Sequence, residues 1–252
     1  MDLSIDGRMQ GLDLFSGIGG ITKALEGYVR PVAYCEIDPY ARGVLLSRMF
    51  SGDIPDAPIW DDVSSLRGSM LPSIDIIYGG FPCQDISVAG RQKGLAGKQS
   101  GLFFEIMRLA EEIKPSFIFL ENVANIRHCG LESVLREMAS RGYDCRYGIL
   151  SARDVGAPHK RDRWFILAHA NSDRLETLDG VGQVCEPTDT KLQLCSSTKM
   201  QMWDTDAPPV TETCGMANGV PNRVDRMRAV GNAVVPAQAR EAFERLMGLK
   251  CA

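Results

Sequence analysis

A short apolar run that leads into two glycines, a proline and a cysteine constrains this chain more than any other feature. The run at 74–78 reads Ile-Asp-Ile-Ile-Tyr, and its β-branched and aromatic residues indicate a buried strand. Gly79 and Gly80 then predict a turn that bulkier residues would not adopt, and Pro82 stiffens the backbone before Cys83. Ligands bind at the carboxyl ends of strands in open α/β sheets, so Cys83 is a candidate nucleophile. A small buried hydrophobic residue is the alternative.

Predicted strands and helices alternate along the rest of the chain. Apolar runs indicate further strands at 11–15, 32–36, 59–63, 116–120, 143–150 and 164–169. Helical patterns cover 21–28, 39–50, 102–113, 131–141 and 237–247. This alternation is typical of an α/β domain, and 252 residues suffice for one such domain and a small appendage.

A glycine-rich turn follows the first predicted strand. Residues 16–20 read Ser-Gly-Ile-Gly-Gly and join the strand at 11–15 to the helical pattern at 21–28. Strand, glycine turn and helix together bring the backbone close to a nucleotide-like ligand. Thr22 stands where a dinucleotide fingerprint has its third glycine. That residue argues against a nicotinamide enzyme and for a ligand without a pyrophosphate.

Acidic residues follow three of the predicted strands. Glu36 closes the strand at 32–36 and suits a carboxylate that holds ribose hydroxyls, with a solvated acid as the alternative. Asp62 has the chemistry to accept a hydrogen bond from an adenine amino group, with a turn aspartate as the alternative. Glu121 follows the strand at 116–120, on the same sheet edge as the cysteine. Emergence from an apolar strand should raise its pKa, which suits proton donation at neutral pH.

Basic residues gather in three short clusters, at 91–98, 160–163 and 223–228. The net charge of −4 is a mild argument against a nucleic-acid partner, but a local basic face can bind phosphates. Arg161 and Arg163 flank an aspartate in an extended segment. We expect them to face opposite sides, one toward the site and the other toward a structural acid; a solvated basic turn is the alternative.

Two polar stretches interrupt the pattern. The loop at 85–100 contains three glycines and three cations, which suits a functional lid, with a disordered segment as the alternative. Residues 170–217 carry eight acidic and three basic residues without a clear period, which predicts a separate small lobe or a long excursion of the chain. A zinc site of Cys185, Cys195 and Cys214 would lack the usual ligand spacing, so we expect no metal and eight reduced thiols.

The first residues lack the basic and apolar segments of a signal peptide, and no apolar run reaches the length of a membrane span. We therefore expect a cytoplasmic protein that does not contact a membrane.

Five motifs in order resemble the DNA (cytosine-5)-methyltransferases. They are Asp-Leu-Phe-Ser-Gly-Ile-Gly-Gly at 13–20, Phe-Pro-Cys-Gln at 81–84, Glu-Asn-Val at 121–123, the Arg-x-Arg pair at 161–163 and Gly-Asn-Ala-Val-Val-Pro at 231–236. The short chain and the run at 220–226 look most like compact prophage or phage-type members.

The resemblance implies a Rossmann-like sheet that binds S-adenosyl-L-methionine, with helices on both faces and a small irregular target-recognition lobe. It implies a catalytic and cofactor-binding domain at 9–169, a target-recognition region at 170–218 and a returning segment at 219–252. The cofactor-binding residues that it implies are Phe15, Gly17, Gly20, Glu36, Asp62, Pro82, Leu102 and Asn232.

The resemblance also implies the chemistry: methyl transfer to carbon 5 of a flipped cytosine in duplex DNA, through a covalent bond between Cys83 and C6. Cys83 matches the nucleophile, Glu121 the cytosine-binding acid and Arg163 the arginine that contacts the flipped base. The DNA-binding residues that it implies are Gln84, Ser87, Arg91, Lys98 and Arg161. We expect a monomer in the cytoplasm of a bacterial or phage-infected cell, where a cognate restriction endonuclease is one partner that the family allows.

Three features depart from the family pattern. His159 stands where a glutamine is usual, the region at 170–218 is short and acidic, and the segment before Gly231 matches only in part. Two other functions therefore stay open: an RNA cytosine methyltransferase of the tRNA-modifying branch, against which Gln84 argues, and a non-catalytic DNA-binding accessory protein. An accessory protein would be expected to lack Cys83 or Glu121, and both are present.

Overall fold

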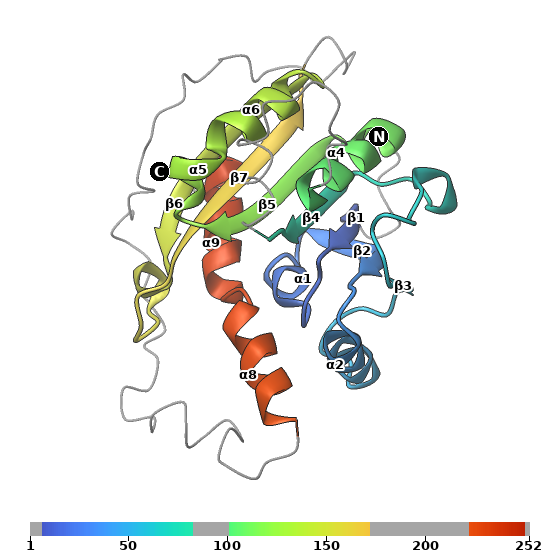
Figure 1. Cartoon of the computed structure of the whole chain (residues 1–252), viewed down its shortest axis with the longest axis vertical. Helices are drawn as coiled ribbons and strands as arrows, with labels where there is room; N and C mark the ends of the chain where they lie inside the picture. The colour runs from blue at the N-terminus through green and yellow to red at the C-terminus, as the bar shows by residue number, and fades with distance from the viewer. Residues whose placement is uncertain (1–6, 83–100, 172–221, 250–252) are drawn as a thin grey trace.

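The computed structural model describes residues 7–82, 101–171 and 222–249, which build one seven-stranded sheet (Figure 1). The strand order is β3-β2-β1-β4-β5-β7-β6, and β7 runs antiparallel to both of its neighbours. The strands are β1 (Met9–Leu14), β2 (Val29–Cys35), β3 (Ile59–Trp60), β4 (Ile76–Gly80), β5 (Phe117–Val123), β6 (Tyr143–Ser151) and β7 (Asp162–Ala170). The order reverses between β1 and β4, which is where doubly wound sheets open a ligand crevice.

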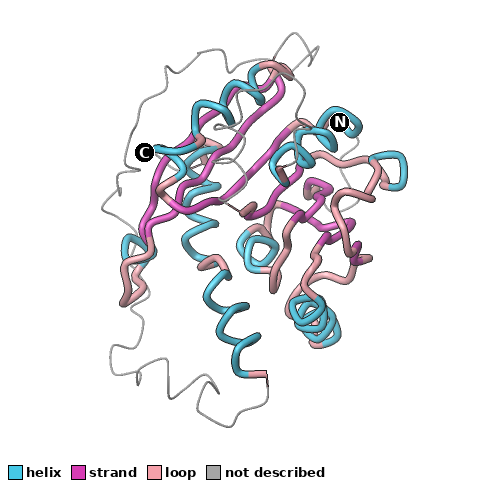
Figure 2. Tube along the Cα trace, viewed as in Figure 1, coloured by secondary structure: helices cyan, strands magenta, loops and turns pink. Residues whose placement is uncertain are grey.

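Helices cover both faces of the sheet, as Figure 2 shows by secondary structure. The α-helices are α1 (Gly20–Ala24), α2 (Pro39–Phe50), α4 (Leu102–Ile113), α5 (Ile126–Cys129), α6 (Leu131–Ala139), α8 (Arg223–Asn232) and α9 (Pro236–Leu246). Two 3₁₀ turns, η1 (Gly68–Met70) and η2 (Ala152–Val155), complete the described elements. Helices α4, α5 and α6 share one hydrophobic cluster with the sheet, and α1 and α9 share the other. The predicted Rossmann-like α/β class is confirmed.

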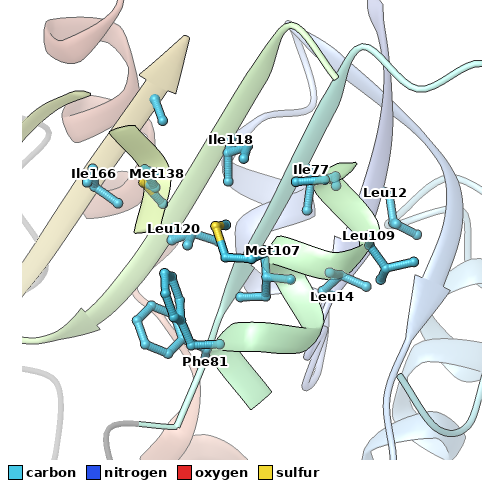
Figure 3. Packing of buried hydrophobic residues seen from close by; sticks show 14 of the residues in the cluster. Leu12, Leu14, Ile77, Phe81, Met107, Leu109, Ile118, Leu120, Met138 and Ile166 are labelled. Atoms are coloured by element: carbon cyan, nitrogen blue, oxygen red, sulfur yellow. The ribbon is translucent and has the colours of Figure 1, made fainter. Parts of the chain in front are cut away.

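The central parallel strands are buried on both faces, which explains their nearly continuous apolar sequences. On the α4 side, Leu14, Ile77 and Leu120 face Met107 and other apolar residues (Figure 3). These strand residues have no exposed surface. The packing fixes the carboxyl ends of β1, β4 and β5 side by side.

Local sequence signals set several helix boundaries as predicted. Helix α2 begins at Pro39 because Asp38 Oδ1 accepts hydrogen bonds from the backbone N–H groups of Tyr40 and Ala41. Helix α4 also has its predicted bounds. The predicted helix at 21–28 is too long, however, because α1 ends at Ala24 and a turn returns the chain to β2.

Helix α8 was missed by the sequence reasoning. Four of its ten residues are charged, and Val224, Met227 and Val230, which recur every three residues, are exposed, so the helix has only a weak apolar period. It leads into α9, and Figure 1 shows α8 extending away from the sheet. The helix therefore relies on its connection to α9 and on few tertiary contacts.

Within the described residues, no helix has the length and apolar character needed to cross a membrane. In the same residues, no group of three His, Cys, Asp or Glu side chains is arranged to hold a metal. The zinc candidates, the predicted lid at 85–100 and nearly all of the predicted lobe at 170–218 lie outside the described residues.

Candidate active site

The turn after β1 has the left-handed backbone that its glycines permit. Gly17 and Gly19 have φ values of 53° and 79°, and Phe15 adopts a φ of 54°. Positive φ is rare for a bulky residue and often marks a functional site. Ser16 Oγ supports the turn by donating to the carbonyl oxygen of Asp13, at 2.9 Å. A Cβ added to Gly17 would meet no atom within 4 Å, so the turn leaves open space beside its backbone.

Glu36 closes this turn from the end of β2. Its Oε2 accepts a hydrogen bond of 2.7 Å from Gly17 N, and its Oε1 accepts one of 2.8 Å from Asp38 N. Each carboxylate oxygen keeps a second lone pair for another donor. The predicted role on ribose hydroxyls is therefore compatible with a second, structural role that the sequence did not indicate.

Asp62 lies after β3 and is engaged in its own turn. Its Oδ1 accepts hydrogen bonds from Ser64 N at 2.9 Å and from Ser64 Oγ at 2.8 Å. The Ser64 backbone bond lowers the pKa of this carboxyl, so it stays ionised. These hydrogen bonds are those of an aspartate that stabilises a turn, which is the alternative interpretation of the sequence.

The returning end of the chain lies against the glycine turn. A Cβ added to Gly20 would lie 2.8 Å from Val234 Cγ1, so only glycine allows this close approach. Asn232 is the last residue of α8, two positions before Val234. Leu102 begins α4 and packs against the core cluster below the same sheet edge.

Gly79 and Gly80 belong to strand β4, so the predicted glycine turn is wrong. They permit close approach instead, and neither has a positive φ. A Cβ at Gly79 would lie 1.9 Å from the carbonyl oxygen of Leu14, and one at Gly80 would lie 2.8 Å from Glu121 Oε2. Because Gly80 pairs directly with Glu121 across β4 and β5, its missing side chain leaves room for the Glu121 carboxyl.

Glu121 is held in this position by an ion pair. Its Oε1 lies 2.7 Å from Arg163 Nε, and the two side chains are only 12% and 16% exposed. Burial raises the pKa of Glu121 above its usual value, while Arg163 and Arg161 lower it in part. The predicted direction of this pKa shift is confirmed. Arg163 occupies Oε1, and Oε2 points toward β4, the strand that leads to position 83.

The expectation that Arg161 and Arg163 face opposite sides is wrong. Residues two apart in an extended segment point to the same face. Both guanidinium groups lower the pKa of the Glu121 carboxyl, so both lie on its side. Arg161 Nη2 donates to the carbonyl oxygens of Gly231 at 2.9 Å and Ala233 at 2.8 Å. Arg161 therefore fastens the returning segment to the start of β7, and no acid is its hydrogen-bond partner among the described residues.

Asn122 fixes the segment that leads out of β4. Its Nδ2 donates to the carbonyl oxygen of Phe81 at 2.8 Å, and its Oδ1 accepts from Val123 N. The side chain is 2% exposed. Phe81 immediately precedes Pro82, so this bond couples the approach to Cys83 with the strand that carries Glu121.

A buried polar network below the glycine turn was also missed. Thr22 Oγ1 donates to Asp13 Oδ2 at 2.6 Å and lies 2.9 Å from the hydroxyl of Tyr78. Burial raises the pKa of Asp13 to about 7. The sequence indicated only that Thr22 argues against a dinucleotide-binding site. In the fold, its hydroxyl links Asp13 on β1 to Tyr78 on β4 by hydrogen bonds.

Several predicted site residues have no described position. Cys83, Gln84, Ser87, Arg91 and Lys98 lie outside the described residues. Pro82 is the last described residue of its segment and is exposed. The structure thus brings together Phe15, Gly17, Gly20 and Glu36 in one group and Gly80, Glu121 and Arg163 in another, along adjoining strand ends.

Comparison with known proteins gives consistent relatives. The family model described as C-5 cytosine-specific DNA methylase matches residues 9–216. The chain is 36% identical over 237 residues to the type II methyltransferase M.CviJI of Paramecium bursaria Chlorella virus IL3A, covering 93% of this chain and 58% of the relative. It is 36% identical over 165 residues to the type II methyltransferase M.HhaI of Haemophilus parahaemolyticus, covering 64% and 49%.

A solved structure agrees with the fold. The putative DNA modification methyltransferase encoded within an Escherichia coli prophage superposes with a TM-score of 0.52 and 27% identity, covering 68% of this chain and 49% of that one. The chain therefore spans roughly half the length of the relatives that it matches.

Proposed function

This chain belongs to the C-5 cytosine-specific DNA methylase family, and we propose that it transfers a methyl group from S-adenosyl-L-methionine to carbon 5 of a cytosine in duplex DNA. One observation supports the proposal above all others. A buried carboxyl with a raised pKa lies over Gly80, held by an arginine on one oxygen, and its other oxygen points toward the strand that leads to Cys83. That arrangement suits a group that shares a proton with a pyrimidine ring.

The residues at the ends of β1, β2 and β3 fit S-adenosyl-L-methionine. The open space at Gly17 suits the approach of a ligand to the backbone, and Glu36 retains lone pairs for ribose hydroxyls. Asp62 would bind the adenine amino group, Phe15 would contact the base, and Asn232 would contribute from the returning segment. When bound, this cofactor supplies an electrophilic methyl group.

Cys83 would carry the covalent step. Carbon 5 of cytosine is a weak nucleophile, and addition of a thiolate at C6 forms a C6–S bond and converts the ring to an enamine whose C5 is reactive. After the methyl group is attached, loss of the C5 proton and cleavage of the C6–S bond restore the aromatic ring and the thiolate. Cys83 comes three residues after Gly80, which ends β4 and pairs with Glu121.

Glu121 would assist by holding a proton for N3 of the ring. Burial favours the protonated carboxyl, and a proton shared with N3 draws electrons away from C6, which favours attack by the thiolate. Arg163 keeps the carboxyl in place through Oε1. Neither the ring face nor N3 is accessible within a stacked duplex, so the base must be extruded.

The test is transfer of a labelled methyl group to duplex DNA and, in parallel, to tRNA. We expect labelled 5-methylcytosine in DNA, and bisulfite sequencing of DNA from expressing cells should locate it. Label in tRNA with none in DNA would favour the RNA branch. DNA binding without transfer to either substrate would favour a non-catalytic accessory protein.

A further inference from the structure

A cavity of about 620 Å³ opens beside the site, and none of the proposed cofactor-binding or base-binding residues lines it. It begins at Ala124 and Asn125, directly after β5, and extends to Arg127 on α5, Arg153 on η2 and Lys160 before β7. It therefore lies at the same sheet edge as Glu121. The residues that line it come from the end of β5 through α5 and from the end of β6 through the start of β7.

Strand pairing separates this cavity from the Glu121 carboxyl. Val123 pairs with Arg163 across β5 and β7, and Ser151 pairs with Asp162 across β6 and β7. Asp162 lines the cavity, and its side chain points to the face opposite that of Arg163 because neighbouring strand residues alternate. The cavity is thus adjacent to the Glu121–Arg163 pair but on the α5 and α6 side of the sheet.

The cavity carries an excess of positive charge. The two acids in its lining are already engaged: Asp154 Oδ2 accepts from Ser151 N at 3.0 Å, and Asp162 Oδ2 lies 3.2 Å from Lys160 Nζ. Three cations, Arg127, Arg153 and Lys160, line the cavity with these two carboxylates, so the lining carries one net positive charge.

The donors of the two arginines are available to a ligand. Arg127 Nε donates to His128 Nε2 at 3.0 Å, which orients the guanidinium and leaves its terminal nitrogens for another acceptor. Among residues 7–82, 101–171 and 222–249, the Arg153 guanidinium has no hydrogen-bond acceptor. Both side chains are exposed, so a large ligand can reach them.

We propose that Arg127 and Arg153 bind backbone phosphates of duplex DNA next to the extruded cytosine. A guanidinium presents parallel N–H donors that match phosphate oxygens, and phosphate contacts orient a protein on DNA without reading its sequence. The hollow is open and polar, which suits a hydrated phosphodiester strand. This inference rests on the proposed function, since it takes duplex DNA to be the substrate.

The test is the salt dependence of DNA affinity, measured by fluorescence anisotropy with a labelled duplex. Each phosphate contact contributes about 0.9 to the slope of log K against log salt concentration. The double variant Arg127→Gln and Arg153→Gln should bind more weakly, with a slope smaller in magnitude by about 1.8 if each arginine neutralises one phosphate. Arg136→Gln is the matched control: it removes an exposed arginine on α6, away from the cavity, and should leave the slope unchanged.

An unchanged slope and affinity in the double variant would overturn the inference. So would an equal loss in the Arg136→Gln control, because the effect would then reflect total charge alone. Methyl transfer by the unmodified chain is measured separately. Binding without transfer would contradict the proposed function, while the slope comparison would still decide the role of the cavity.

Discussion

The two oxygens of the Glu121 carboxyl have different surroundings. Arg163 Nε lies 2.7 Å from Oε1, whereas Oε2 lies over the bare backbone of Gly80. Burial keeps the pKa of the group high even beside a guanidinium. Arg163 therefore fixes one oxygen, and in the proposed function the other oxygen would share a proton with the substrate.

Replacement of Glu121 by glutamine should slow the chemical step by about 100-fold or more, because an amide has no acidic proton to share. The measurement is the single-turnover rate of methyl transfer at saturating DNA. Glu132→Gln, which changes an exposed glutamate on α6, should leave this rate unchanged. A Glu121→Gln variant with a normal rate and only weaker DNA binding would contradict the proposed role.

Asp13 should make stability depend on pH. Burial raises its pKa from an ordinary value near 4 in the unfolded chain to about 7 in the folded protein. Between these pH values the folded state binds more protons than the unfolded state, so the contribution of Asp13 is full below about pH 4 and is lost as pH rises through about 7.

The measurement is the free energy of unfolding in urea for the unmodified chain and for Asp13→Asn. Their difference should fall by up to about 4 kcal/mol between pH 4 and pH 7, and then stay level. A difference that does not change with pH would show that Asp13 titrates normally.

Single residues show where sequence reasoning succeeds and fails. Glu121 and Arg163 were identified because each sits in a specific local motif, and the fold brings them into contact. The role of Gly80 depends on β5 passing beside β4, and that of Thr22 on β4 passing beside β1, and both neighbours are far away in sequence. A local pattern does not distinguish a glycine needed for a turn from one needed for close approach.

At the scale of elements, the pairing of β4 with β1 and β5 determines where the site can form. Gly79 pairs with Leu14 on one side, and Gly80 pairs with Glu121 on the other. Asn122 then ties the exit of β4 to β5 through the carbonyl oxygen of Phe81. Two strands and one amide therefore set the relative positions of the Glu121 carboxyl and the segment that precedes Cys83.

Alanine at Gly80 and at Gly79 should have different effects. A Cβ at Gly80 would meet the movable Glu121 carboxyl, so Gly80→Ala should fold but transfer methyl groups much more slowly. A Cβ at Gly79 would meet the Leu14 backbone, so Gly79→Ala should lower the melting temperature sharply. Gly43→Ala is the control: the added Cβ on α2 meets nothing within 4 Å. Equal rates for Gly80→Ala and Gly43→Ala would contradict this explanation.

Prediction of the elements was most accurate where local signals were strong. The bounds of α2 and α4 were predicted because a cap and a clear apolar period mark them. The exposed helix α8 carries only a weak apolar period, and α1 ends early because the chain must turn back to pair β2 with β1. These boundaries follow from tertiary constraints, which a local sequence window does not contain.

In the molecule as a whole, helix α9 packs against the sheet that the earlier part of the chain forms. Helix α9 packs on β6, β7 and α1, and its Gln238 donates from Nε2 to the carbonyl oxygens of Leu150 at 2.7 Å and Arg161 at 2.8 Å. Arg161 in turn holds the segment before α9. This reciprocal bonding joins the returning segment to the strands that carry Glu121 and Arg163.

Gln238→Leu should lower the free energy of unfolding by about 1–3 kcal/mol, because buried carbonyl oxygens lose a donor. It should also reduce methyl transfer, because the carbonyl oxygen of Arg161 loses the hydrogen bond that helps to position this residue. Urea unfolding and the single-turnover rate measure the two effects. Ala237→Gln, an exposed change on the same helix, should alter neither. Full stability in Gln238→Leu would show that α9 is held without these bonds.

The central claim is that Cys83 attacks a cytosine whose N3 is held by Glu121, and its most direct test uses duplex DNA that contains 5-fluorocytosine. Fluorine at C5 does not leave as a proton does, so the bond between sulfur and C6 should persist. With S-adenosyl-L-methionine present, we predict a protein–DNA adduct that survives denaturing electrophoresis for the unmodified chain and no adduct for Cys83→Ser. Methyl transfer to ordinary duplex DNA without any adduct on the fluorinated duplex would contradict the account.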